Sequence, residues 1–130
     1  MTPVGIPYRW RFEPTPRSIA VARRRVREIL EARSIPAPTI EMVELLTSEV
    51  VTNAIVHGES APEVELVVSD QQVRVAVEDD SPEEPKVTSV EPTALTGRGL
   101  DLVDRFSATW GTTRVGPGKQ VWFEVPFAFR

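Results

Sequence analysis

The sequence has no cysteine among its 130 residues. This absence excludes disulfides, cysteine zinc sites and thiol nucleophiles. The sequence also lacks any apolar run that approaches the roughly 18 residues of a membrane-spanning helix. Residues 1–11 lack the apolar core of a secretory signal. From these absences we expect a cytoplasmic protein without a membrane partner.

Lysine is scarce as well, with 2 lysines against 13 arginines, and the formal net charge is −4. This balance argues against a protein that binds nucleic acid directly. Four arginines nevertheless cluster near the start of the chain, at Arg23, Arg24, Arg25 and Arg27. Such a cluster is typical either of a solvated helix face or of a patch that binds a partner or steers a phosphate.

The length fits a single domain, residues 1–130, with a core at about residues 8–126. Hydrophobic periodicity and turn residues predict strands and helices in mixed order. The expected strands are 8–13, 64–68, 73–77, 107–114 and 119–126; the expected helices are 16–34, 39–57 and a short one from residue 100. We therefore predict an α+β fold: a two-layer α/β sandwich with a mixed, mostly antiparallel sheet and helices on one face. The other face is a candidate for exposure or for association into a homodimer.

Capping residues predict the limits of the two long helices. Thr15 is expected to cap the first helix, which should stop near Ser34 because two prolines follow. Thr39 is expected to cap the second helix, with Glu41 favourably placed in its first turn. Gly58 would end that helix in a left-handed conformation.

The helix 39–57 carries the first candidate site. Its apolar stripe consists of Val43, Leu46, Thr47, Val50 and Ala54. At about 100° per residue, Glu49, Asn53 and His57 fall within an arc of about 80° that borders this stripe. The opposite side, expected to face water, carries Glu41, Glu44, Ser48 and Thr52. Glu49 and Asn53 are therefore either boundary residues that face solvent or residues that line a filled pocket.

Two further segments have a pattern that suits a ligand. The strand 73–77 runs into Glu78-Asp79-Asp80-Ser81-Pro82, where an acid at the strand end can accept a hydrogen bond from a ligand amino group; a plain turn is the alternative. The glycines of Thr96-Gly97-Arg98-Gly99-Leu100 precede a helix, whose N-terminus can bind phosphate. The last strand, from Gly118 to Val125, carries no functional signal by itself.

In this order, the segments resemble one family over about residues 10–125. The phrases from Glu44 to His57 and from Gly97 to Val103 resemble the Bergerat-fold ATPases, which include histidine kinases and the Hsp90 chaperone. Within that family the chain is most similar to the single-domain bacterial anti-sigma-factor serine kinases. Only the box Asp79-Asp80-Ser81-Pro82-Glu83 departs from the family pattern Asp-x-Gly-x-Gly, because both glycines are missing.

The resemblance implies that ATP and Mg²⁺ bind here. It implies that Asn53 coordinates Mg²⁺, that Glu49 is the general base and that Asp79 holds the adenine amino group. Ser81 would stand in for the first missing glycine, and residues 83–96 would form a lid. The residues that would approach the phosphates are Gly97, Arg98, Gly99 and Leu100. His57 either faces the nucleotide or lies at a helix C-terminus that favours its charge.

The resemblance also implies a function and partners. We expect an anti-sigma factor with serine/threonine kinase activity towards an anti-sigma-factor antagonist, and a sigma factor as the second partner. The arginine-rich helix 16–34 is a candidate interface. A non-catalytic module that binds nucleotide or protein remains the alternative, and the altered Asp79 box favours it. A histidine-kinase catalytic domain is a third interpretation, which the lack of a preceding dimerisation helix disfavours.

Overall fold

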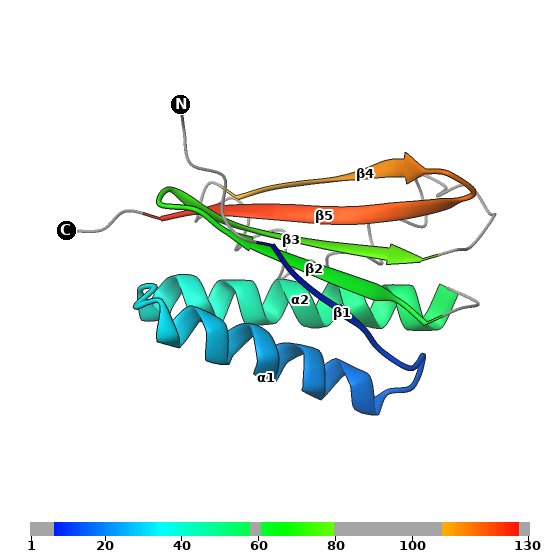
Figure 1. Cartoon of the computed structure of the whole chain (residues 1–130), viewed down its shortest axis with the longest axis horizontal. Coiled ribbons are helices and arrows are strands. Elements are labelled where there is room, and N and C mark those ends of the chain that lie inside the picture. The colour runs from blue at the N-terminus through cyan, green and yellow to red at the C-terminus, as the bar shows by residue number, and fades with distance from the viewer. Residues whose placement is uncertain (1–6, 58–60, 80–107, 128–130) are drawn as a thin grey trace.

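The structure is a computed structural model that describes residues 7–57, 61–79 and 108–127. In this part of the chain, two helices lie side by side against one face of a single sheet (Figure 1). The elements in chain order are β1 (Pro7–Arg11), α1 (Arg17–Ala32), α2 (Ala37–His57), β2 (Glu63–Val68), β3 (Gln72–Asp79), β4 (Thr109–Val115) and β5 (Gly118–Pro126). The predicted two-layer α+β architecture is therefore confirmed.

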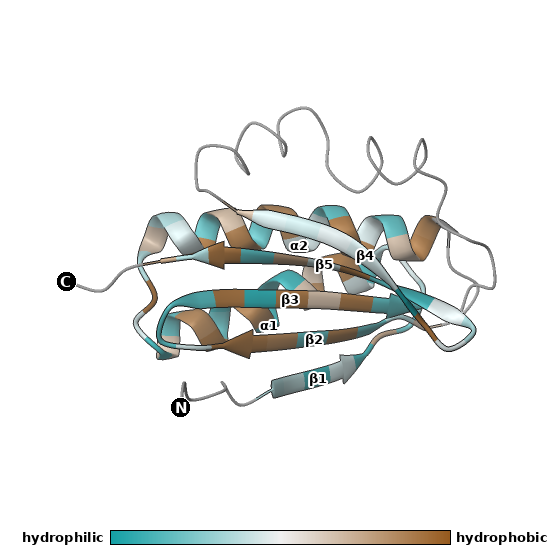
Figure 2. Ribbon diagram, turned by 90° about the horizontal axis from the view of Figure 1, so that it is seen from above, coloured by the Kyte–Doolittle hydropathy of each residue, from teal (hydrophilic) through white to brown (hydrophobic). Residues whose placement is uncertain are grey.

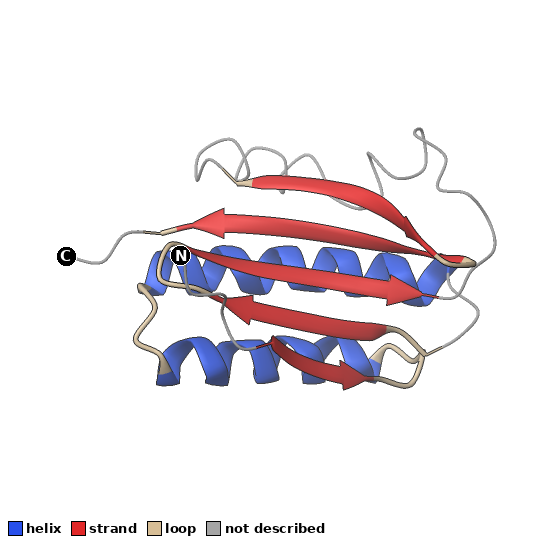
Figure 3. Ribbon diagram, turned by 45° about the horizontal axis from the view of Figure 1, so that its top comes forward, coloured by secondary structure: helices blue, strands red, loops and turns tan. Residues whose placement is uncertain are grey.

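The five strands are arranged in the order β1-β2-β3-β5-β4 (Figure 3). Every described pairing is antiparallel, which fits the predicted mostly antiparallel sheet, although no parallel pair occurs among the described strands. The hairpins β2–β3 and β4–β5 are those that the alternating valines and the glycine-rich turn predicted. In the second turn Gly116 has a φ of 55°, which a glycine adopts without steric cost.

Side chains on the helix-facing side of the sheet form the core with the two helices. The central strands are the hydrophobic ones, whereas β1 and β4 at the edges are more polar (Figure 2). The buried strand residues alternate with outward-facing ones, as a half-buried sheet requires. They are Val64, Leu66, Val68, Val73, Val75, Val77, Val121, Phe123 and Val125. Each such side chain contributes about 1.5–3 kcal/mol when it is fully buried.

Helix α1 begins one residue later than predicted and ends in a Schellman motif. Its N-cap is Pro16, without a side-chain hydrogen bond, so the predicted cap at Thr15 is wrong. The Ser18 hydroxyl instead donates to the carbonyl of Glu13 at 2.7 Å. At the other end Ser34 has a φ of 57°, and the N–H of Ile35 donates to the carbonyl of Leu30 at 3.0 Å. This left-handed residue ends the helix and turns the chain towards α2.

Helix α2 begins at Ala37, two residues before the predicted cap at Thr39. Thr39 is a buried residue inside the helix, and Glu41 lies beyond the first turn, which contains no acid. The reason is that a proline is tolerated in the first turn, where its missing N–H has no intrahelical partner. The Pro36 carbonyl accepts the first such bond, from the N–H of Ile40 at 3.0 Å. The predicted helix end at Gly58 lies outside the described residues.

The helix-free face of the sheet is covered by ion pairs between neighbouring strands. Arg9 pairs with Glu65 at 2.7 Å, and this contact raises the pKa of the Arg9 guanidinium above its ordinary value. Arg74 pairs with Glu124 at 3.0 Å and also lies over the ring of Trp122. This face is therefore built for contact with water or with a polar surface, whereas the chemistry suggested by the sequence lies on the other side.

Candidate functional site

Helix α2 places Glu49 and Asn53 beside its buried stripe. The predicted stripe residues Val43, Leu46, Thr47, Val50 and Ala54 are all buried. Asn53 is buried as well, with only 7% of its surface exposed, whereas Glu49 is half-buried. Among the residues that the structure describes, none donates a hydrogen bond to the Asn53 Oδ1 atom. Because a buried polar atom without a partner costs about 1–3 kcal/mol, this oxygen is suited to contact a ligand.

Strand β3 ends at Asp79, which points to the helix-facing side of the sheet. The register pairs it with Lys119 near the start of β5. Both residues are buried, with 2% and 7% exposed, and Lys119 Nζ lies 3.6 Å from Asp79 Oδ2. The predicted strand-end acid is therefore a buried, ionic group. Its lysine partner was not predicted, although Lys119 alternates in phase with the buried Val121 and Phe123 and so belongs to the inner face.

The fold brings these residues to one end of the two layers. Helix α2 and strand β3 end where β5 begins (Figure 1). Asn53 in the last turns of α2, Asp79 and Lys119 are therefore at the same end, and α2 packs against both β3 and β5. Arg114 on β4 is in register with Lys119 and continues the row of charged residues across the sheet. This end, which we call the charged end, is the candidate site.

Several predicted site residues lie outside the described part of the chain. They are Ser81, Gly97, Arg98, Gly99 and Leu100, together with the predicted lid at residues 83–96. His57 is the last residue of α2, and its side chain is also outside the described part. The predicted roles of these residues therefore stay predictions, and the description of the site rests on α2, β3 and β5.

The donor atoms at the charged end fit a magnesium nucleotide. Amide oxygens are ligands that Mg²⁺ accepts, and Mg²⁺ in nucleotide sites takes few protein ligands because phosphates and water supply the rest. Asn53 Oδ1 is such an oxygen. Within residues 7–57, 61–79 and 108–127, no three His, Asp or Glu side chains converge to hold a metal alone. A carboxylate such as Asp79 can accept a hydrogen bond from the amino group of a base.

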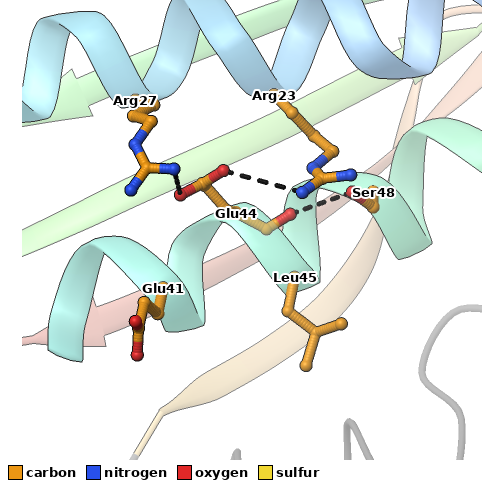
Figure 4. Close-up of a pocket in the computed structure, with 6 residues that line it drawn as sticks. All are labelled: Arg23, Arg27, Glu41, Glu44, Leu45 and Ser48. Carbon is orange, nitrogen blue, oxygen red and sulfur yellow. Dashed lines mark hydrogen bonds and ion pairs between the residues drawn. The ribbon is translucent and has the colours of Figure 1, made fainter. Parts of the chain in front are cut away.

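A second charged cluster lies in the helix layer. Glu44 was predicted to face water but is buried, because Arg23 and Arg27 of α1 reach across to it (Figure 4). The distances are 3.7 Å from Arg23 Nη2 to Oε2 and 3.2 Å from Arg27 Nη1 to Oε1. A pocket of about 390 Å³ opens beside this cluster; Glu41, Leu45 and Ser48 complete its lining. Two of the four clustered arginines thus join α1 to α2.

The chain belongs to the family of histidine kinase-like ATPase domains, which it matches over residues 12–125. This match covers both long helices, the charged end and all strands except β1 and the last residue of β5. The fold of the described residues is the Bergerat ATP-binding fold that the resemblance predicted. No curated protein matches the sequence.

The chain is similar to several solved structures. One contains the RsbU and RsbW domains of Rv1364c from Mycobacterium tuberculosis (18% identity, 96% of this chain, 34% of that chain, TM-score 0.67). Another is the catalytic domain of the histidine kinase ThkA (18%, 92% and 95%, TM-score 0.52). The histidine kinase domain of the blue-light activated kinase EL346 from Erythrobacter litoralis is 33% identical over 70% of this chain and 46% of that chain (TM-score 0.48). The chain thus spans about a third of the first structure and under half of the third.

Neither α1 nor α2, the two helices of the described residues, combines the length and the apolar character that crossing a bilayer requires. The family match establishes the family of this chain, and the similar solved structures agree with its fold.

Proposed function

We propose that this protein binds ATP with Mg²⁺ at the charged end and acts as a cytoplasmic regulatory protein. The observation that carries the proposal is the buried Asn53 Oδ1, an acceptor without a hydrogen bond on the helix that also carries Glu49. Asp79 supplies a buried carboxylate at the same end, where it accepts a hydrogen bond from the adenine amino group. Asn53 coordinates Mg²⁺, which neutralises charge on the phosphates. The whole chain acts as one ATP-binding domain.

The reaction that we assign is phosphoryl transfer to a serine or threonine of a partner protein. The hydroxyl oxygen forms a bond to the γ-phosphorus, and the bond between that phosphorus and the β,γ-bridging oxygen breaks, which releases ADP. Glu49 is half-buried one turn before Asn53, so it can accept the hydroxyl proton. Positioning and charge stabilisation would supply most of the rate enhancement, as is general for this class of reaction.

The partners in this proposal are a sigma factor and an anti-sigma-factor antagonist, the second of which is phosphorylated. The proposal rests on the resemblance of the segments from Glu44 to His57 and from Gly97 to Val103 to anti-sigma-factor kinases. Helix α1 is one candidate interface, because Arg24 and Arg25 are exposed on it. The helix-free face of the sheet is a candidate for a homodimer, which sedimentation velocity tests: a single monomeric species at high concentration would rule the dimer out.

A non-catalytic binding module is the second candidate function. The residues that favour it are Ser81, Pro82 and Glu83, where the family pattern has glycines at the first and third positions. Under this proposal nucleotide binding alone would switch the partner, and no phosphate would be transferred. The two candidates share the nucleotide site and differ only in the need for Glu49.

The nucleotide site is tested by calorimetric titration with ATP in the presence and absence of Mg²⁺. The wild type should bind ATP, and Mg²⁺ should strengthen binding. In the Asn53→Ala variant the effect of Mg²⁺ should disappear, because the metal loses its protein ligand. Thr52→Ala is the matched control, since Thr52 is the exposed neighbour on the same helix. Absence of binding at millimolar ATP would refute both candidate functions.

Phosphoryl transfer is tested with γ-labelled ATP and a purified anti-sigma-factor antagonist as substrate. A kinase should label the antagonist on serine or threonine, and Glu49→Gln should reduce labelling by about 100-fold or more. The same variant should retain ATP affinity within a few fold. If the wild type binds ATP but transfers no label to the antagonist, the module is the correct function.

A further inference from the structure

Lys119 is a buried cation whose hydrogen-bonding capacity is not used by the described residues. Its side chain is 8% exposed, and its single ion pair is the 3.6 Å contact with Asp79 Oδ2. That separation exceeds a normal N–H···O hydrogen bond, which spans about 2.7–3.2 Å. An ammonium carries three N–H donors. No hydrogen bond from Nζ is present within residues 7–57, 61–79 and 108–127.

A structural ion pair alone does not account for this arrangement. Removing an ammonium from water costs several kcal/mol, which a buried partner offsets only when the geometry is close and the remaining donors are satisfied. Here the register fixes the two strands face to face, Asp79 opposite Lys119, yet the two charged groups stay further apart than a hydrogen bond. The lysine therefore has donors available for a group that enters the charged end.

An acid and an ammonium held side by side present one acceptor next to one donor. The amides of Asn and Gln present the same pattern, and with it they read adenine, whose 6-amino group donates and whose neighbouring ring nitrogen accepts. Asp79 and Lys119 repeat this pattern with two charged groups on adjacent strands. The charges strengthen each hydrogen bond relative to a neutral amide.

We propose that Lys119 contacts the base directly. Its ammonium donates a hydrogen bond to the adenine ring nitrogen next to the amino group, and that amino group donates a hydrogen bond to Asp79. This inference rests on the proposed binding of ATP and names a specificity-determining residue for it. The ring nitrogen is N1 or N7, because these two acceptors lie on either side of the 6-amino group. Lys119 thereby takes a direct part in base recognition, in addition to its pairing with Asp79.

The test uses the wild-type protein and base analogues, so that it does not depend on a variant that folds. Calorimetry measures the Kd of ATP, 1-deaza-ATP and 7-deaza-ATP with Mg²⁺. One of the two deaza analogues should bind about tenfold or more weakly than ATP, because it lacks the acceptor for a charged donor. If both bind like ATP, Lys119 does not contact the base. Purine riboside triphosphate, which lacks the amino group, reports separately on Asp79.

Variants sharpen this result. In Lys119→Met the affinity for ATP should fall to that of the weaker deaza analogue, and the analogue should lose no further affinity. Arg11→Met removes a cation from the helix-free face, where Arg11 pairs with Glu63, and should bind all ligands as the wild type does. If purine riboside triphosphate binds weakly while both deaza analogues bind like ATP, the inference fails and the proposed function stands. If no analogue and no ATP binds, both fail.

Discussion

Two carboxylates in the described part of the chain are buried, and the protein treats them differently. Glu44 in the helix layer forms ion pairs with two arginines of α1, whose side chains stay about half exposed (50% and 49%). Asp79 at the charged end pairs with Lys119, which is nearly as buried as Asp79 itself. Both are ion pairs between different elements of the fold, but only the first keeps its cations in contact with water.

The difference separates a charge that supports the fold from a charge that is available to a ligand. The two arginines that pair with Glu44 stay half exposed to water, so the cost of burying this carboxylate is offset by cations that are not themselves buried. Arg27 also reaches Glu44 at 3.2 Å, close to hydrogen-bonding distance. At the charged end the 3.6 Å contact leaves Lys119 with unused donors. Incomplete pairing in a buried place is therefore the physical mark of the candidate site.

The largest expected effect concerns Lys119. Lys119→Met removes the ion pair between Lys119 and the buried Asp79, so the free energy of unfolding should fall by about 3 kcal/mol. Urea denaturation followed by circular dichroism measures the change. Asp79→Asn in the same chain should restore a large part of the loss, because the carboxylate that lost this ion pair is gone. Equal stability of the wild type and Lys119→Met would show that the pair is solvated rather than buried.

Glu44→Gln should cost less, about 1 kcal/mol, because both arginines can turn to water once the charge is removed. The loss should shrink in high salt, since exposed cations are screened. Urea denaturation at low and high ionic strength measures both points. A loss as large as that of Lys119→Met would mean that the ion pairs of the two carboxylates contribute equally to stability, which would contradict this difference between them.

Replacing a buried polar side chain in the core should have the opposite effect and raise the stability. Thr47 is fully buried on α2, and its Oγ1 has no hydrogen-bond partner in the structure. Thr47→Val keeps the shape and removes the unsatisfied hydroxyl, so stability should rise by about 1 kcal/mol while ATP affinity stays unchanged. Thermal unfolding and calorimetry measure the two quantities. A drop in ATP affinity would place Thr47 in the site beside Asn53.

The smallest expected effect concerns the connection that sets α1 against α2 and so positions the Glu44 cluster. Ser34 has a φ of 57°, a conformation that disfavours any residue with a Cβ. Ser34→Gly should therefore raise the free energy of unfolding by about 0.5 kcal/mol, after the entropic cost of glycine is subtracted. Urea denaturation measures it. A decrease would show that the Ser34 side chain contributes a contact that outweighs the strain.

Much of the fold follows from local pattern. The buried stripe of α2 and the inner faces of β2, β3 and β5 are the positions that periods of 3.6 and 2 select. The cap predictions at Thr15 and Thr39 failed because a proline can lie either just before a helix or within its first turn. Boundaries therefore depended on a choice that the sequence leaves open.

The sequence predicted Asp79 as a residue of the candidate site but did not predict its partner Lys119. Asp79 ends a valine-rich strand, so its place at the end of a buried strand was readable from the sequence. Lys119 and Glu44 were missed because their partners, Asp79 and the α1 arginines, come from other elements, and only tertiary structure brings them together. For Lys119 the period-2 alternation with Val121 was a usable signal. For Glu44 no local signal distinguished it from the exposed Glu41.

The central claim is that the charged end binds ATP and the Glu44 cluster does not. Calorimetric titration of ATP–Mg²⁺ into the wild type, Asp79→Asn and Glu44→Gln compares the two carboxylates directly. The account predicts that Glu44→Gln binds ATP as the wild type does, and that Asp79→Asn binds at least about tenfold more weakly, since the adenine amino group loses a charged acceptor. Equal affinity of the wild type and Asp79→Asn, or a loss confined to Glu44→Gln, would contradict it.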